Sequence, residues 1–101
     1  MNTLEVIHLR LAGVSPETLA DSIRAAVEPS SEQIKIRVYR HGRVKTDLVV
    51  HLHREVDEGD DRVSKLGNQL ASMLRGYGLV EHSVWVEAFG PPPPPASPEK
   101  T

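Results

Sequence analysis

The sequence contains no cysteine, which excludes a disulfide framework, a thiolate metal site and cysteine-based chemistry. It also lacks any apolar run near the ~18 residues that a membrane span requires. The first residues, MNTLEV, have neither the basic start nor the long apolar stretch of a signal peptide. A net charge of −2 provides no general attraction to nucleic acid or anionic lipid. We therefore expect a cytoplasmic protein without membrane contact.

Hydrophobic residues make up 39% of the 101 residues and charged residues 26%, a balance typical of one globular domain. We place this domain at residues 1–90. The remaining residues, 91–101, read PPPPPASPEKT and carry no packing pattern. They are expected to form a Pro-rich disordered tail that acts as a spacer or a free end.

Four segments alternate between apolar and polar residues, the pattern of half-buried strands. They span residues 4–11, 33–40, 44–54 and 79–89. In the first, Ile7 and Leu9 share one side while His8 and Arg10 share the other. The same alternation divides each of the other segments into an apolar side and a mixed side.

Two segments instead show the spacing of amphipathic helices. The first begins after Ser15, a suitable N-cap, and places Leu19 and Ile23 on its apolar stripe. The second covers about residues 62–77 and ends near a pair of glycines. An acidic loop precedes it, and we expect the last aspartates of this loop, Asp60 and Asp61, to cap the helix.

The resulting order of elements, strand, helix, strand, strand, helix, strand, resembles the ferredoxin-like split βαβ plait. This resemblance extends over about residues 3–90 and concerns architecture alone. It implies an α+β fold in which two helices cover one face of a four-stranded antiparallel sheet with spatial order 4-1-3-2. The arginine loop of acylphosphatases is absent from LAGVSPE, and the paired-cysteine loop of metal chaperones cannot form without cysteine.

The second and third strands are close enough in sequence to form a hairpin. Ile36 and Leu48 must share a face, so the numbers of paired residues must add up to an even number. A three-residue loop, 41–43, satisfies this condition. It predicts that Ile36 lies opposite Leu48 and Arg37 opposite Asp47.

The face of the sheet away from the helices is the candidate functional surface. The alternation predicts a mixture of imidazole, aromatic and charged side chains there, and the site residues we select are His8, Arg37, Tyr39, His51, His53 and Trp85. Such a face is an apolar patch that monomers tend not to leave bare, and Trp and Tyr are enriched at interface centres. The leading interpretation is therefore a non-catalytic binding or assembly module that forms a homodimer or binds a protein partner.

Two alternative interpretations remain open. His8, His51 and His53 offer imidazoles for a metal ion, because a His-x-His pair on a strand points both rings the same way. Separately, a basic strip beside Tyr39 suits nucleic acid, and it consists of Lys35, Arg37, Arg40, Arg43 and Lys45. No nucleophile, phosphate-loop or dinucleotide motif is present, so we expect neither catalysis nor a cofactor.

Overall fold

The computed structural model describes residues 2–13, 15–28, 34–55 and 62–89. They form an α+β fold, as predicted, with a four-stranded antiparallel sheet and two helices. The elements in chain order are β1 (Asn2–Leu11), α1 (Pro16–Val27), β2 (Lys35–Arg40), β3 (Asp47–Glu55), α2 (Lys65–Leu74) and β4 (Gly78–Val86). The predicted tail, 91–101, lies outside the described residues.

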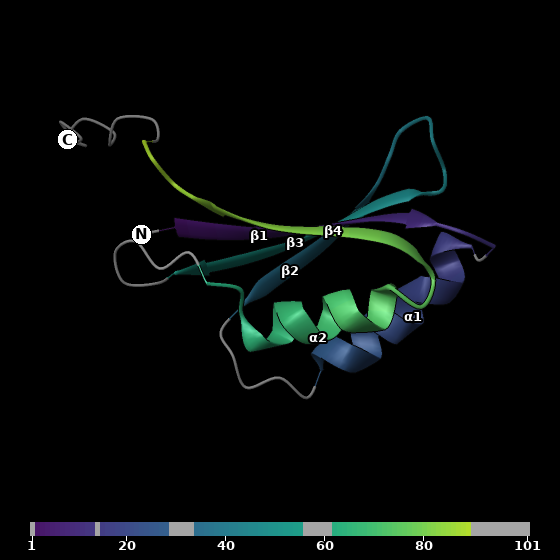
Figure 1. The fold of residues 1–101 in the computed structure, drawn as a ribbon, viewed down its shortest axis with the longest axis horizontal. Helices are drawn as coiled ribbons and strands as arrows, with labels where there is room; N and C mark the ends of the chain where they lie inside the picture. Colours follow the sequence, from purple (N-terminus) through teal and green to yellow (C-terminus); the bar gives the residue numbers. More distant parts are fainter. Residues whose placement is uncertain (1, 14, 29–33, 56–61, 90–101) are drawn as a thin grey trace, which may run out of the picture.

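The strands lie in the order β2-β3-β1-β4, so β3 and β1 are central and β2 and β4 form the edges. Both helices lie on the same side of this sheet, and no described helix or strand covers the opposite side, which we call the uncovered face (Figure 1). The turn between β2 and β3 rises above the uncovered side at one end of the sheet, and the chain after β4 rises above it at the other. No helix in the described part of the chain is long and apolar enough to cross a membrane.

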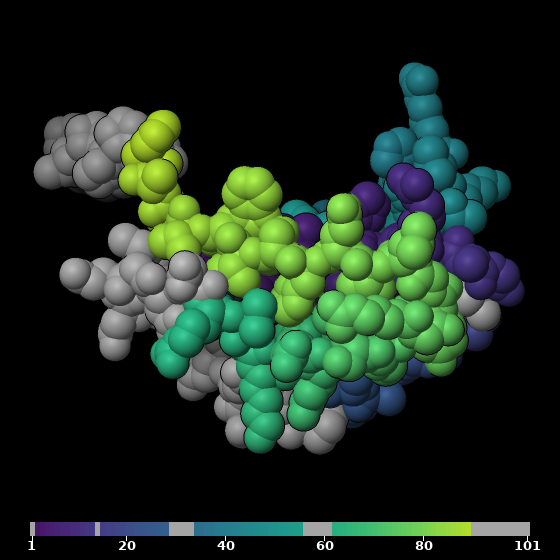
Figure 2. Space-filling model, in the orientation of Figure 1, coloured from purple at the N-terminus to yellow at the C-terminus, as the bar shows by residue number. Residues whose placement is uncertain are grey.

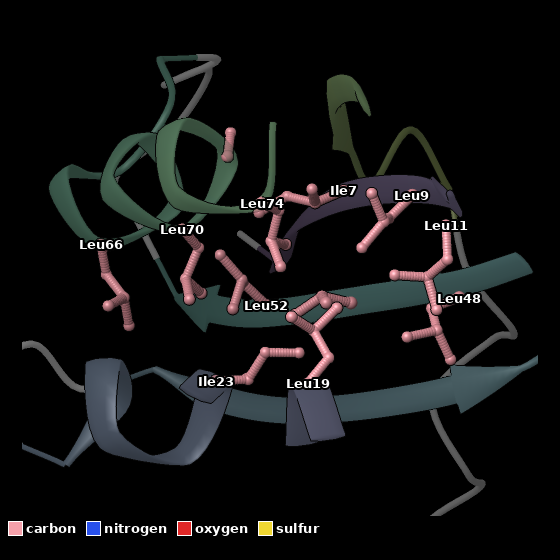
Figure 3. Close-up of a cluster of buried hydrophobic side chains, with 12 residues drawn as sticks. Ile7, Leu9, Leu11, Leu19, Ile23, Leu48, Leu52, Leu66, Leu70 and Leu74 are labelled. Atoms are coloured by element: carbon pink, nitrogen blue, oxygen red, sulfur yellow. The ribbon is translucent and has the colours of Figure 1, made fainter. Parts of the chain in front are cut away.

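The core fills the space between the helices and the sheet (Figure 3). The alternation of β1 and β3 directs Ile7, Leu9 and Leu52 to this side, where each is fully buried. Leu19 of α1 and Leu70 of α2 pack against them from the helix layer. The predicted inward faces of these strands and helices are therefore confirmed.

Serine caps both helices. Ser15 begins α1, as predicted, and its Oγ accepts a hydrogen bond from the Thr18 amide. Ser64 begins α2, and its Oγ accepts from the amide of Gly67 at 2.8 Å. The capping role predicted for Asp60 and Asp61 is thus taken by Ser64, and the two aspartates lie outside the described residues.

The register of the β2–β3 hairpin corrects the prediction. Ile36 lies opposite Leu52, and Arg37 lies opposite His51 and not Asp47. The residue numbers of each observed pair still add up to an even number, as predicted. Ile36 therefore shares a face with the apolar residues of β3. The loop is longer than three residues because His41 Nδ1 accepts hydrogen bonds from the amides of Arg43 and Val44, which stabilises a wider turn that ends at Asp47.

Candidate functional site

The uncovered face of the sheet is built from every second residue of all four strands. Pairing across the strands arranges these residues in rows that run from β2 through β3 and β1 to β4. The four rows are Lys35–His53–Leu4–Trp85, Arg37–His51–Val6–Ser83, Tyr39–Val49–His8–Glu81 and, on the last three strands only, Asp47–Arg10–Leu79. All six predicted site residues therefore lie on this one face.

Large apolar side chains remain exposed at both edges of the uncovered face. Trp85 of β4 is 62% exposed and Tyr39 of β2 is 47% exposed. Between these edges, Leu4 and Val6 of β1 are half-buried, although no helix lies above them. Figure 2 shows the face edge-on, with the chain standing higher at its two ends than in the middle. The face is a shallow, partly apolar trough.

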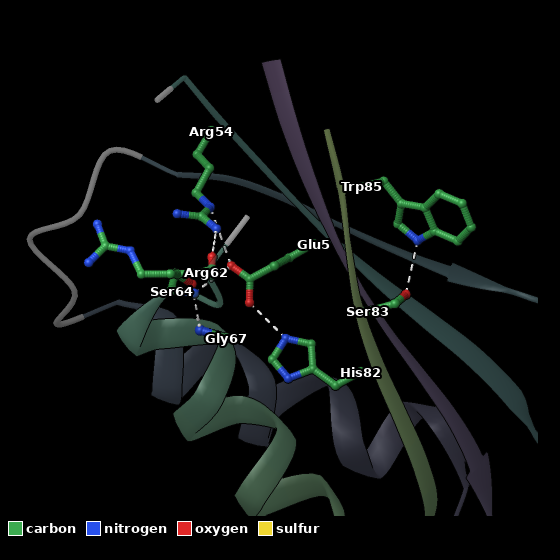
Figure 4. A network of polar contacts seen from close by, with 8 residues as sticks. All are labelled: Glu5, Arg54, Arg62, Ser64, Gly67, His82, Ser83 and Trp85. Atoms are coloured by element: carbon green, nitrogen blue, oxygen red, sulfur yellow. Dashed lines mark hydrogen bonds and ion pairs between the residues drawn. The ribbon is translucent and has the colours of Figure 1, made fainter. Parts of the chain in front are cut away.

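The indole of Trp85 is held in place within its own strand. Its Nε1 donates a hydrogen bond to Ser83 Oγ at 2.9 Å, as Figure 4 shows. This bond satisfies the only polar atom of the indole and leaves the ring itself exposed. A hollow of about 250 Å³ beside the ring is lined in part by Leu4 and His53. The indole is thus fixed beside this hollow.

The two histidines of β3 form a row of rings with Tyr39. The centroids of Tyr39 and His51 are 5.0 Å apart, and those of His51 and His53 are 5.9 Å apart, both with edge-to-face geometry. Burial lowers the pKa of His51, and the positive charge of a protonated His53 lowers it further. The neutral imidazole of His51 is thus favoured.

His8 lies apart from these rings and between two carboxylates. Its Nε2 is 3.3 Å from Asp47 Oδ2, and its Nδ1 is 3.7 Å from Glu81 Oε1. Arg10 Nε lies 3.4 Å from the other oxygen of Asp47. Asp47, which the predicted hairpin register placed opposite Arg37, is therefore paired with His8 and Arg10.

The residues selected for the metal interpretation do not converge. His51 and His53 face each other edge-on, while His8 is directed toward Asp47 and Glu81. Within the described ranges, no group of three or more His, Asp or Glu side chains is close enough to hold a metal ion. A metal site on His8, His51 and His53 remains a prediction without geometric support.

The five cations of the nucleic-acid interpretation are all exposed but do not form one strip. Lys35 and Arg37 lie on the uncovered face, whereas Arg40 lies on the opposite side of the same strand, because its partner Leu48 points into the core. Arg43 and Lys45 belong to the turn that rises at the end of the sheet. Nucleic-acid binding stays a prediction.

A second polar cluster, which the sequence analysis did not identify, lies on the helix side of the sheet (Figure 4). Its centre is Glu5 of β1, which is fully buried. One carboxylate oxygen accepts a hydrogen bond from the Ser64 amide at 2.9 Å and lies 3.4 Å from Arg54 Nε. The other oxygen lies 2.7 Å from His82 Nε2. Figure 4 places this cluster and Trp85 on opposite sides of β4.

The Glu5 cluster joins β1, β3 and β4 to the first turn of α2. The carboxylate sits at the N-terminus of α2, where the positive end of the helix dipole is directed and where it accepts the Ser64 amide hydrogen. His82 and Arg54 are nearly buried as well, with side chains 9% and 11% exposed. Because so little of the cluster reaches solvent, we assign it the structural role of fixing α2 on the sheet.

The sequence signal that predicts this cluster is the alternation of buried and exposed positions along β1 and β4. Glu5 has the same parity as Ile7 and Leu9, so the alternation that buries them also buries Glu5. His82 shares its parity with Val84, which places it under the helices and not in solvent at the start of the strand. Ser64 is buried as the N-cap of α2 and does not lie on the exposed helix surface.

Comparison with models of known protein families, with curated proteins and with solved structures finds no match to this chain.

Proposed function

We propose that this protein is a small binding and assembly module that associates with a second copy of itself through the uncovered face of its sheet. The observation that supports this proposal is the exposure of Trp85 on a face where half-buried aliphatic residues also lack a cover. Contiguous apolar patches of this kind mark interaction sites. Trp is also among the residue types most enriched at the interface positions that contribute most to affinity.

The fold we infer for the module is the ferredoxin-like plait. Its support is the strand order β2-β3-β1-β4, which becomes β4-β1-β3-β2 when counted from the other edge. This is the order that the resemblance implies, and the two helices on one side of the sheet agree with it. In such a module the uncovered face is the largest regular surface on which a second sheet can pack, at a distance of about 10 Å.

Replacing Trp85 with Asp is expected to convert the dimer to a monomer. The substitution puts a charge where the partner would cover the indole, and truncation of an interface Trp that dominates affinity typically costs about 2–4 kcal/mol, or about a thirtyfold to a thousandfold loss of affinity. Sedimentation equilibrium at several concentrations measures the change.

The matched control is Val63→Asp. Val63 is 45% exposed and precedes α2 on the helix side, so this variant introduces the same charge at a similarly exposed apolar position away from the uncovered face. Its dimer constant should equal that of the wild type. Equal association by the wild type and Trp85→Asp would refute the proposed surface.

Dimerisation is expected to weaken as the pH falls from about 8 to about 5.5, because His51 must remain neutral under a partner. Its pKa is already lowered by burial and by His53, and the other charged group that faces it is Arg37 on β2. Removal of the remaining water disfavours protonation further, so the stabilisation is present above the pKa of the monomer and is lost below it. Each additional unit of lowering corresponds to about a tenfold weaker dimer at low pH per histidine, and to about a hundredfold for the two His51 side chains of the dimer.

The His51→Gln variant is the control for this titration. It keeps a neutral polar side chain at position 51 and removes the group that titrates. Its dissociation constant should change less between the two pH values than that of the wild type. A wild-type constant that stays the same across the range would rule out burial of His51 in the dimer.

A further inference from the structure

Charge on the uncovered face is distributed unequally between its two edges. On β2, Lys35 and Arg37 are exposed and point away from the helices. On the opposite edge, the side chain of Glu81 is 86% exposed, and Glu87 follows directly after β4. The two central strands carry mainly imidazole and aliphatic side chains between these edges. The face is therefore basic at one edge and acidic at the other.

This asymmetry distinguishes two ways in which a two-fold axis can bring two such faces together. An axis parallel to the strands places β2 of each copy over β4 of its partner, because it exchanges the two edges and keeps the rows. An axis across the strands places β2 over β2 and β4 over β4. The first arrangement joins opposite charges, and the second brings like charges together, which destabilises an interface.

We infer that two copies of this chain pack face to face about an axis parallel to their strands, with the basic β2 edge of each copy over the acidic β4 edge of the other. This inference rests on the proposed function and adds the orientation of the partner. Arg37 of one copy then lies over Ser83 of the other copy, in the row adjacent to that of Glu81. The guanidinium of Arg37 can reach the carboxylate of Glu81 from there. Lys35 lies over Trp85, where an ammonium group above an indole gains a cation–π contact.

The same axis gives the histidines an apolar partner. It places β3 of each copy over β1 of the other while the rows are kept, so His51 faces Val6 and His53 faces Leu4 of the second copy. An axis across the middle of the strands would instead place β3 over β3 with the rows reversed, so that His51 would face Val49 and His53 would face Asp47. The opposite charges of the two edges are thus the feature that favours the axis parallel to the strands.

A charge-reversal exchange tests this orientation. Arg37→Glu and Glu81→Arg are each expected to weaken their own homodimer at least tenfold at low salt, since each creates two like-charge contacts. Mixing the two variants should restore association to near the wild-type level. In the mixed dimer the carboxylate introduced at position 37 faces the guanidinium introduced at position 81, and the unchanged Arg37 of one copy faces the unchanged Glu81 of the other. The double variant should likewise recover its homodimer.

Arg40→Glu is the matched control, because it reverses the same charge on the same strand but on the opposite side of the sheet. Its homodimer should resemble the wild type. If the wild type dimerises but the mixed variants do not recover, the orientation is wrong while the proposed surface stands. Tighter pairing of Arg37→Glu with the wild type than of the wild type with itself would indicate the axis across the strands. A wild type that is monomeric at every concentration would overturn the proposed function itself.

Discussion

Replacing Glu5 with Leu is expected to destabilise the fold by about 3–5 kcal/mol, the usual cost of removing one partner from a buried ionic cluster. The variant leaves Arg54 without its carboxylate, and it leaves His82 and the Ser64 amide without their acceptor. A domain of this size has a total stability of about 5–15 kcal/mol. The urea midpoint at a fixed protein concentration should therefore fall by roughly 2 M.

Glu5→Gln is the matched comparison for this experiment. Its amide oxygen can still accept the Ser64 amide hydrogen, and its NH₂ group can donate to His82 in the appropriate tautomer. Only the charge opposite Arg54 is lost, so a smaller loss of about 1–2 kcal/mol is expected. If Glu5→Leu unfolds at the same urea concentration as the wild type, the cluster does not hold α2 on the sheet.

Replacing Gly67 with Ala is expected to destabilise the protein by about 1–3 kcal/mol, the range observed for overpacked sites, although Ala is the better helix former. A Cβ atom at this position would lie 1.9 Å from Glu5 Oε2 and 2.7 Å from Glu5 Cδ. Because Glu5 is fully buried and bonded to His82 and Ser64, its carboxylate cannot move aside without breaking those contacts. Thermal or urea unfolding measures the loss.

Two comparisons make this prediction specific. Gly76→Ala places a Cβ no closer than 3.4 Å to any atom and should change stability little. In a Glu5→Ala background the obstructing carboxylate is gone, so adding Gly67→Ala should be neutral or slightly stabilising. An equal loss in both backgrounds would mean that the effect of Gly67→Ala does not arise from contact with Glu5.

The alternation of the strands predicted most of this structure, because parity alone decides which side of a sheet a residue occupies. It placed Ile7 and Leu52 in the core, and His51 and Trp85 on the uncovered side. The same rule, applied to Glu5 and His82, would have predicted the buried cluster. A polar residue at an apolar position of an alternating strand, as Glu5 and His82 are, is therefore the sequence signal of a buried polar cluster.

The hairpin register could not be obtained in the same way. Parity requires an even sum of paired numbers, and a shift of four residues satisfies that requirement equally well. The observed register depends on the side chain of His41, whose ring nitrogen accepts two amide hydrogens in the turn. The sequence pattern contains no signal for such a local acceptor. The predicted pairing of Arg37 with Asp47 is therefore wrong, although the face predicted for each residue is correct.

The chemistry of the uncovered face depends on the registers of β3 with both of its neighbours, β1 and β2. With Asp47 beside His8 and Arg10, the histidines of β3 have no carboxylate next to them in their rows. His51 is therefore flanked by Arg37 and Val6, which suits an imidazole that must stay neutral under a partner. Composition and alternation predicted which residues share the face, but only the paired rows reveal that its two edges carry opposite charge.

The most direct test of the central claim is the mass of the wild-type protein in solution near pH 8, measured by sedimentation equilibrium up to about 0.5 mM. Self-association through the uncovered face predicts twice the 11.2 kDa of one chain at the upper concentrations. A mass that stays at that of a single chain over the whole range would contradict it.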